Sequence, residues 1–348
     1  VYSGRFYPLS LGTDPIDDYW HLRQKVALFD VPEHPIQIEG PDAERFLDHL
    51  LTRDMRTVPP GRARYALAVD HEGHILMDGV LIRWTDDRFW YVMADGDFLG
   101  WIRAQAAAYN VTVSDPGSWV LQVQGPRSLA MLADACDGGA PDPLPYFGAA
   151  PAHIAGQAVL VTRTGWTGEL GFEVYTLPGT DPEALWRGLL AAGEQHDLRV
   201  ASLECMGIRR IEAGILDNGT DMDPSMTPYQ AGLGKFVDLD KPSFIGRGAL
   251  LDAPRDCLLF GVAGPGTPVP HAQVRQAGTR VGRVRAGAWS PSLSTGLGYV
   301  QFDAPGDWVG STVTIDGCDG EATVCALPFL DAERFIPRGL ADEPVRPA

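Results

Sequence analysis

Hydrophobic residues recur along this chain with two different periods, which predicts both helices and strands. After Gly40-Pro41-Asp42 the apolar positions follow helical spacing, and Asp42 is the expected N-cap. The buried stripe of that helix comprises Phe46, Leu47, Leu50 and Leu51. Further helices are predicted at 18–23, 98–109, 127–136 and 181–195, and one carries Met206, Ile208, Ile211 and Ile215. Short strands are predicted at 36–38, 89–94, 120–124, 158–162 and 172–175.

Residues 63–70 and 74–84 are rich in strand formers and flank a turn at His71-Glu72-Gly73, which predicts a β-hairpin. Helices mixed with antiparallel strands, without regular βαβ alternation, indicate an α+β fold rather than a doubly wound sheet. From about residue 250 to 330, glycines and prolines divide the chain into short strands that favour a small β-barrel. The tail after Pro337 is polar and proline-rich, and we expect it to fray.

The segment 161–175, VTRTGWTGELGFEVY, is the most unusual stretch of the chain. Gly165, Gly168 and Gly171 permit positive φ and the close approach of another surface, so this turn could hold Trp166 over a cavity. In the strand that follows, Glu173 and Tyr175 share one face, because side chains alternate along a strand. A carboxylate and aromatic rings together suit a flat polar heterocycle and a small cation. The alternative is a bulged hairpin with Trp166 in the core.

Asp78 is a candidate catalytic residue because it is the one carboxylate in an apolar strand, HILMDGV. A buried acid needs a partner or a function, since its desolvation is unfavourable. Tyr65 lies on the neighbouring strand of the predicted hairpin. The alternatives are that Asp78 binds backbone amides at the strand end beside Gly79 and that Tyr65 is a core residue.

Charge and composition exclude several classes of function. The 45 acidic residues exceed the 28 basic residues, giving a net charge of −17, which disfavours nucleic acid or an anionic membrane as partner. There is neither an apolar run that could span a bilayer nor a signal-peptide-like start, so we expect a cytoplasmic protein. The five cysteines are scattered and lack CxxC spacing, and the histidines form no HxxxH or HxH pair, so no metal site is expected. The patterns GxxxxGK[ST] and GxSxG are absent, and no GxGxxG follows a strand.

Several blocks, in order over nearly the whole chain, resemble the folate-dependent aminomethyltransferase family. They are LFDV (28–31), G-PDA-RFL (40–47), G-HILMD (73–78), VQGP (123–126), GWTGELGFEVY (165–175), RRIEAGILDNGTDMD (209–223), TPYQAGLGKFVDLDK (227–241), FIGRGAL (244–250) and WSPSLSTGLGYV (289–300). The resemblance implies a three-domain disc, with two interleaved α+β domains and a C-terminal β-barrel around a central tetrahydrofolate cavity. We expect one α+β domain from 1–50 and 135–245, a second from 51–134, the barrel at 250–335 and a tail at 336–348.

The resemblance also implies roles for individual residues. Asp78 matches the acid beside the reactive folate nitrogen, Glu173 the acid that holds the pteridine, and Tyr65 a ring that lines the folate. Trp166 and Tyr175 match aromatics that surround a sulfonium substrate. Within the family, DYWHL (18–22), the pair of Trp166 with Tyr175, and the lone acid at 78 look most like dimethylsulfoniopropionate demethylases.

Two features of the sequence give opposite indications about the substrate. Met206 stands where glycine-cleavage T-proteins carry a substrate-binding arginine, whereas Gly168-Glu169 resembles those T-proteins. We therefore expect an enzyme, a monomer or homodimer, that moves a methyl group from a small methylated donor to N5 of tetrahydrofolate. The alternatives are a glycine-cleavage-type aminomethyltransferase, a demethylase of a methylated amine or aryl methyl ether, or a non-catalytic folate-binding assembly factor. The last reading is disfavoured because DKPSFIGRGAL lacks the cysteine of a KGCYxGQE-like loop.

Overall fold

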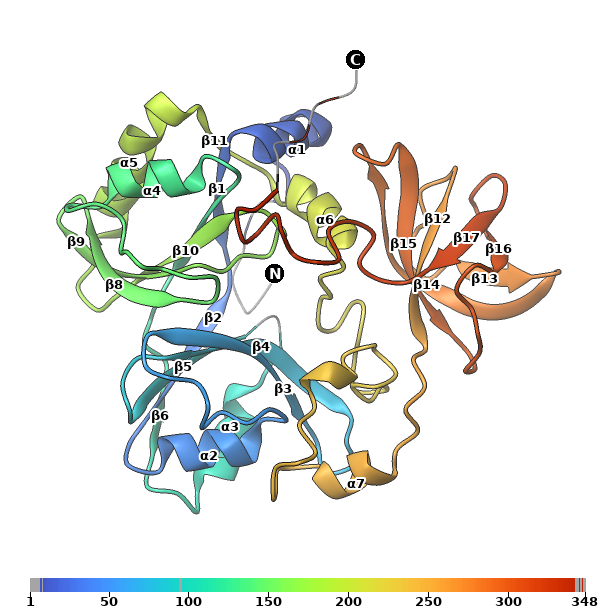
Figure 1. Cartoon of the computed structure of the whole chain (residues 1–348), viewed down its shortest axis with the longest axis horizontal. Coiled ribbons are helices and arrows are strands. Elements are labelled where there is room, and N and C mark those ends of the chain that lie inside the picture. Colours follow the sequence, from blue (N-terminus) through green and yellow to red (C-terminus); the bar gives the residue numbers. More distant parts are fainter. Residues whose placement is uncertain (1–6, 8, 94–95, 342–343, 345, 347–348) are drawn as a thin grey trace.

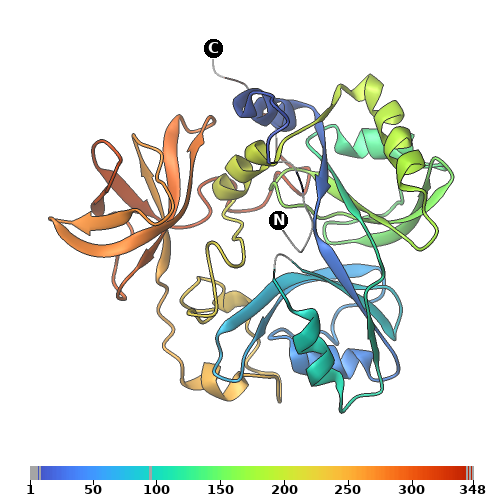
Figure 2. The same cartoon turned by 180° about the vertical axis from the view of Figure 1, so that it is seen from behind.

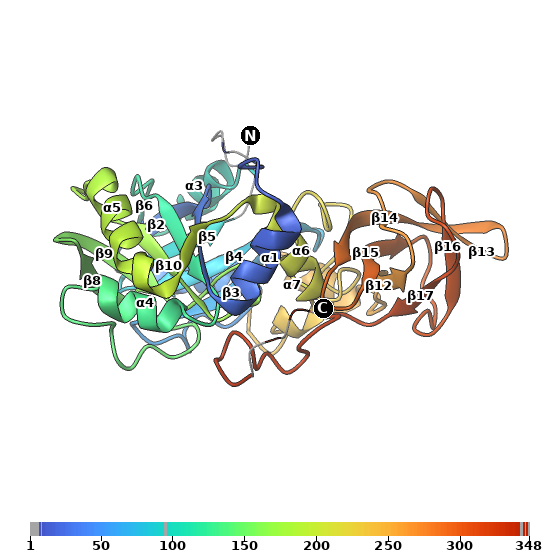
Figure 3. The same ribbon diagram turned by 90° about the horizontal axis from the view of Figure 1, so that it is seen from above.

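Three structural units surround a common centre in the computed structural model of the chain (Figure 1). The structure describes residues 7, 9–93, 96–341, 344 and 346. Seen from above, the two α+β units overlap and the barrel lies at one end of the molecule (Figure 3). The predicted α+β class with a C-terminal barrel is confirmed.

The first unit is a six-stranded sheet with helices on one face. The strand order is β11 (Leu198–Val200), β1 (Val26–Val31), β7 (Val120–Gln124), β10 (Gly171–Thr176), β9 (Gln157–Thr162) and β8 (Ala149–Ile154). The β1–β11 pair is parallel and the other pairs are antiparallel. Helices α4 (Ser128–Ala135) and α5 (Pro182–Gly193) pack on the face that presents Phe172 and Val174, and η1 (Glu194–His196) follows α5. Helices α1 (Pro15–Gln24) and α6 (Leu203–Glu212) pack against each other beside this sheet (Figure 1).

The second unit is a five-stranded antiparallel sheet in the order β3 (Arg62–Val69), β4 (Ile75–Arg83), β5 (Arg88–Met93), β2 (His34–Glu39) and β6 (Thr112–Ser114). Helices α2 (Ala43–Leu50) and α3 (Leu99–Ala106) cover the face that presents Met77 and Leu81. The predicted stripe of α2 is buried, which explains why this helix carries apolar residues at helical spacing.

The chain passes twice between these two sheets, once from β1 to β2 and once from β6 to β7 (Figure 2). Sheet membership therefore groups residues 34–50 with the second unit and β7 and α4 with the first. A division by sheet puts the boundaries in the β1–β2 and β6–β7 connections rather than at residues 50 and 134. We propose that division of the α+β region.

The two sheets pack face to face, and their shared core determines where the candidate residues lie. Phe29 and Tyr175 of the first sheet belong to the same buried cluster as Ile82 and Trp90 of the second. The rings of Trp90 and Tyr175 meet edge to face at 6.0 Å between centroids. The residues that alternate onto these inner faces therefore point toward the space between the sheets.

The third unit is a closed barrel in the order β12 (Leu259–Gly264), β15 (Thr295–Phe302), β14 (Thr279–Ser290), β13 (Gln273–Gln276), β16 (Thr312–Ile315) and β17 (Ala322–Cys325). It is reached through η2 (Gly234–Phe236) and α7 (Arg247–Asp252). Tyr299 of β15 donates to the carbonyl oxygens of Arg210, Ile211 and Ile215 at 3.1–3.2 Å, which fixes the barrel to the C-terminal end of α6.

Several local predictions need correction. The helix predicted at 98–109 ends at Ala106, and strand β8 was not predicted. Ile215 lies beyond α6, because Gly214 adopts φ +64° and ends the helix in the left-handed region. Asp42 stands at the N-cap of α2 but makes no capping hydrogen bond, and its carboxylate accepts from the backbone N–H of Asn110 at 2.9 Å. None of the helices among the described residues is long and apolar enough to cross a membrane.

Candidate active site

Asp78 and Tyr65 are joined directly. Asp78 on β4 is opposite Leu67 in the β3–β4 ladder, so Tyr65 is its diagonal neighbour on the inner face. The Tyr65 hydroxyl donates to Oδ2 of Asp78 over 2.9 Å. The other oxygen, Oδ1, is buried and has no hydrogen-bond partner in the part of the chain that the structure describes. A buried acceptor in this state fits a ligand that presents an N–H group.

The surroundings of Asp78 make its carboxyl titrate near neutral pH. The residue is 7% exposed, and burial raises its pKa to about 7, with the hydrogen bond from Tyr65 opposing that change. The charges of Asp217 and Asp221, in the segment after α6, raise the pKa in the same direction as burial. A carboxyl that titrates near neutral pH is suited to proton transfer.

Two further residues, Phe236 and Arg53, hold Tyr65 in place. The ring of Phe236 in η2 packs edge to face on Tyr65 at 4.7 Å between centroids. Arg53 donates to the carbonyl oxygen of Tyr65 over 2.8 Å and lies 5.3 Å from the centre of the Phe236 ring. Arg53 therefore holds the backbone of Tyr65, and the distant Phe236 packs against its ring.

Glu173 is buried and lies in a network of neutral donors. Gln122 on β7 donates to Oε1 over 2.9 Å, and the hydroxyls of Thr164 and Tyr175 donate to Oε2 over 2.6 Å each. Burial raises the pKa of Glu173, and these hydrogen bonds oppose the rise. The predicted common face of Glu173 and Tyr175 is confirmed by their contact.

The glycines of the β9–β10 turn allow close packing, as the sequence predicted. A Cβ on Gly165 or Gly171 would lie 2.2–2.6 Å from the side-chain amide of Gln124. That amide donates to the carbonyl oxygens of Thr164 and Phe172 at 3.2 and 3.3 Å, so the glycines enclose a buried polar group. Gly168 adopts φ +67° and approaches Ala213 just beyond α6.

Trp166 and Tyr175 have different surroundings, although both were predicted to surround the substrate. Tyr175 is fully buried, and its hydroxyl is directed to Glu173. Trp166 is half-buried, and the Arg210 guanidinium lies 5.1 Å from its ring centre. Arg210 also forms a buried ion pair with Asp221. These contacts place Tyr175 as a support for Glu173 and leave Trp166 as the more accessible ring.

Glu169, in the same turn, is part of an ion-pair network rather than of the Asp78 or Glu173 groups. Its Oε1 accepts from Arg209 over 2.8 Å and lies 3.3 Å from Arg23. Arg209 also pairs with Glu212, which accepts from Tyr19 at 2.9 Å and from Ser290 of the barrel at 2.5 Å. This network joins α1, α6 and the barrel.

The structure therefore brings the two predicted acids to the facing surfaces of the two sheets. Glu173 projects from β10 beside Tyr175, whereas Asp78 projects from β4 on the face that also presents Val80 and Ile82. A connected set of contacts links Glu173 to Gln122, Trp166, Arg210 and Asp221. Asp221 then acts on Asp78 through its charge.

Sequence reasoning missed several residues of this region, and five of them are Gln122, Arg210, Asp217, Asp221 and Phe236. One signal was available, because Gln122 and Gln124 alternate in the otherwise apolar strand VLQVQ. Buried amides need hydrogen-bond partners, so they mark a polar inner face. The contacts of the other four depend on long-range packing.

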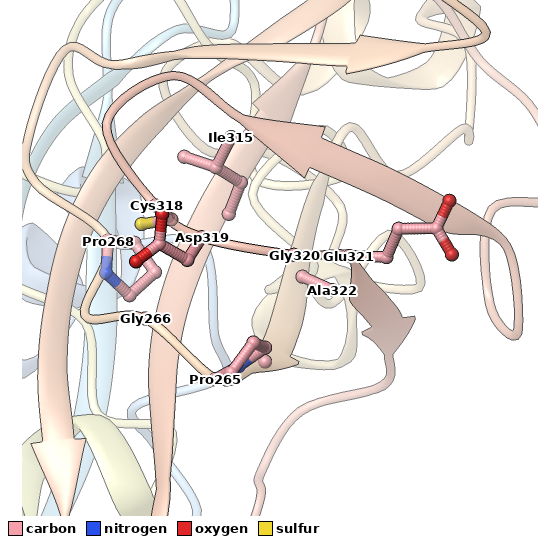
Figure 4. Close-up of a pocket in the computed structure, with 10 residues that line it drawn as sticks. Pro265, Gly266, Pro268, Ile315, Cys318, Asp319, Gly320, Glu321 and Ala322 are labelled. Carbon is pink, nitrogen blue, oxygen red and sulfur yellow. The ribbon is translucent and has the colours of Figure 1, made fainter.

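Two hollows lie away from these residues. One, of about 10 Å³ in the barrel, is lined by Cys318, Asp319 and neighbouring glycines and prolines (Figure 4), and it has space for about one water molecule. The other, of about 230 Å³, is lined by α1 with Arg199 and Arg346. Neither includes any of the five predicted site residues.

Comparison with known proteins identifies the family. The model of the GCVT N-terminal domain matches residues 6–241, and that of the glycine cleavage T-protein C-terminal barrel domain matches residues 257–331. The chain belongs to the glycine cleavage T-protein (GCVT) family. Like the other members of this family, it is a tetrahydrofolate-dependent one-carbon transferase.

Relatives in the GCVT family include proteins with different names. An aminomethyltransferase of Streptomyces coelicolor is 33% identical, over 96% of this chain and 94% of its own length. The dimethylsulfoniopropionate demethylase DmdA of Ruegeria pomeroyi is 32% identical, over 87% of this chain and 85% of its own. The solved glycine cleavage system aminomethyltransferase T from Bartonella henselae superposes with a TM-score of 0.83 at 28% identity, covering 94% of each chain. Because the sequence identities to the aminomethyltransferase and to the demethylase are nearly equal, they do not show whether this chain transfers an aminomethyl or a methyl group.

Proposed function

We propose that this GCVT-family protein moves a methyl group from a small, positively charged methylated donor to N5 of tetrahydrofolate and releases the demethylated donor. A sulfonium such as dimethylsulfoniopropionate is the proposed donor. The observation that carries the proposal is the carboxyl of Asp78, with one oxygen held by Tyr65 and the other buried without a partner among the described residues. It provides a fixed acceptor for a ligand N–H group.

The proposed reaction balances with this one carboxyl group. Bound tetrahydrofolate would supply the nucleophilic nitrogen, N5. The bond from the methyl carbon to the donor sulfur or nitrogen breaks, and its electron pair stays on the donor atom. The reaction also releases the N5 proton, which ionised Asp78 can accept at Oδ1. A donor that leaves as a neutral molecule needs no acid catalyst, so the protein contributes mainly alignment and this proton acceptor.

Glu173 and Tyr65 are the proposed binding residues for reduced folate. A carboxylate that faces two N–H groups of the amino-pyrimidine edge forms paired, charge-assisted hydrogen bonds. Tyr65 would line the folate while it holds Asp78. Tyr175, which donates to Glu173, is assigned a supporting role in place of the substrate contact predicted from sequence.

Two features support a cationic methyl donor. Asp217 places negative charge near Asp78, which favours a cation at this position, whereas the charge of Asp221 is paired with Arg210. Met206 is buried in the core between the sheets, at the position where the T-proteins carry an arginine for their substrate. Trp166 is the ring that we assign to the donor, because part of it remains accessible.

The second candidate function is aminomethyl transfer, which the 33% identity to the Streptomyces coelicolor aminomethyltransferase favours. One experiment separates the two. The protein is incubated with tetrahydrofolate and, in separate reactions, with a panel of methylated sulfonium compounds, amines and aryl ethers or with an aminomethylated carrier protein. Mass spectrometry then distinguishes 5-methyltetrahydrofolate from 5,10-methylenetetrahydrofolate. Formation of the methylene product with the carrier alone would overturn the proposal.

A further inference from the structure

A second carboxyl group lies next to Glu173. The amide nitrogen Nε2 of Gln122 donates to Oε1 of Glu173 over 2.9 Å and to Oε1 of Glu33 over 3.2 Å. Glu33 lies in the β1–β2 connection, where the chain crosses between the sheets. Because one nitrogen is within hydrogen-bond distance of both oxygens, the two carboxyl groups are close neighbours.

The groups around this pair are neutral. Within the described ranges, neither Glu33 nor Glu173 forms an ion pair with an arginine, lysine or histidine. The groups that face the pair are the Gln122 amide on β7, the hydroxyls of Thr162 and Thr164 at β9, and the Tyr175 hydroxyl on β10. In a neighbouring contact, Nε2 of His34, beside Glu33, lies 3.0 Å from a carboxylate oxygen of Asp115. Two neighbouring carboxyl groups without a cation cannot both be ionised at low cost, so the pair retains a proton.

We propose that Glu33 is a further folate-binding residue, which carries the single proton of the Glu33–Glu173 pair and donates it in a hydrogen bond to the ligand. Glu173 then stays ionised and accepts. The amino-pyrimidinone edge of reduced folate has two N–H donors next to one carbonyl acceptor. An acid and a carboxylate with one proton between them provide the complementary set of two acceptors and one donor. This inference rests on the proposed role of Glu173.

The hydrogen bonds determine which of the two acids keeps the proton. Glu173 receives hydrogen bonds from Thr162, Thr164, Tyr175 and Gln122, all of which favour its ionised form. Glu33 receives a hydrogen bond from Gln122. Burial and the charge of Glu173 raise the pKa of Glu33 well above its ordinary value. Glu33 therefore ionises last as the pH rises.

Isosteric amides test the assignment through folate binding. Glutamine at position 33 is an uncharged hydrogen-bond donor, like a protonated glutamate. The affinity of Glu33→Gln for tetrahydrofolate should therefore stay within about threefold of that of the unmodified protein. Glu33→Ala lacks the donor, and Glu173→Gln lacks the carboxylate, so each should bind at least about tenfold more weakly. Calorimetry at pH 7 gives the affinities, with Glu72→Gln as control, because Glu72 is exposed. If Glu33→Gln weakens binding as much as Glu173→Gln does, Glu33 acts as an anion and the inference is wrong.

Thermal unfolding without ligand tests the proton itself. A carboxyl whose pKa is raised on folding loses its stabilising contribution as the pH rises toward that pKa, whereas glutamine does not titrate. As the pH is raised from 5 to 9, the Tm of Glu33→Gln should therefore rise relative to the Tm of the unmodified protein. This relative rise should be smaller when Glu173 is also replaced by glutamine. A Tm difference between Glu33→Gln and the unmodified protein that stays constant over this pH range would overturn the inference. This result does not depend on ligand, so failure of the unmodified protein to bind tetrahydrofolate would count against the proposed function separately.

Discussion

Tyr65 and Asp78 lie on neighbouring antiparallel strands, and the tyrosine hydroxyl donates to one carboxyl oxygen over 2.9 Å while the other oxygen stays buried without a partner among the described residues. This asymmetry gives the two oxygens different roles. Oδ2 fixes the orientation of the carboxyl, and Oδ1 is left for the ligand. The first three predictions follow from this pair.

Asp78→Asn should reduce methyl transfer by about 100-fold or more, because the amide cannot take the N5 proton. Folate affinity should change by no more than a few-fold, since loss of a transition-state interaction lowers the catalytic constant more than ground-state binding. Single-turnover kinetics and calorimetry measure the two quantities. Near-normal single-turnover rates would make Asp78 a structural residue and leave catalysis to alignment.

The pH dependence of kcat/KM should show an ascending limb near pH 7, because Asp78 must be ionised and its pKa is raised to about 7. Tyr65→Phe removes the hydrogen bond that lowers this pKa, so the limb should move to higher pH. Asp217→Asn removes a charge that raises it, so the limb should move to lower pH. Shifts in the same direction in both variants would show that another group controls the limb.

Asp78 should also make the protein less stable as the pH rises. Its pKa is raised on folding, so its favourable contribution is complete below about pH 4 and is lost as the pH rises through about 7. An asparagine side chain does not titrate. As the pH is raised from 5 to 8, the Tm of Asp78→Asn should therefore rise by at least about 3 °C relative to the Tm of the unmodified protein. Calorimetric scans without folate measure this difference. A constant offset across that range contradicts the raised pKa.

Glu173→Ala should weaken tetrahydrofolate binding by at least about tenfold, because the paired acceptors for the pteridine are lost. The fold should persist, since the variant also removes a buried carboxyl group that has no counter-ion among the described residues. Calorimetry gives the affinity and circular dichroism the fold. Unchanged affinity in a folded variant would exclude this role for Glu173.

Gly168→Ala should destabilise the protein more than Gly179→Ala does. Both glycines have positive φ, +67° and +91°, so both substitutions introduce backbone strain. A Cβ on Gly168 would lie 2.5 Å from Cβ of Ala213, whereas nothing lies within 4 Å of one on Gly179 among the described residues. The clash should add roughly 1–3 kcal/mol to the loss of unfolding free energy. Denaturant titration of both variants measures it, and equal losses would show that the contact relaxes at no cost.

Local patterns in the sequence determined the elements and the strongest candidates. The helical spacing of Phe46, Leu47 and Leu50 predicts α2, because an amphipathic helix must bury one side whatever covers it. Strand alternation places Glu173 and Tyr175 on one face for an equally local reason. The family followed from motif blocks spread over nearly the whole chain, since these preserve residue identity and spacing.

Tertiary structure decided the environment of each candidate. The buried oxygen of Asp78, its raised pKa and the charges of Asp217 and Asp221 depend on segments more than a hundred residues apart. The cation that lies over Trp166 and the placing of Glu33 beside Glu173 likewise depend on how separate elements pack together. Sequence spacing predicts which face of an element a side chain occupies, but desolvation and charge depend on what packs against that face, and long-range contacts set that packing.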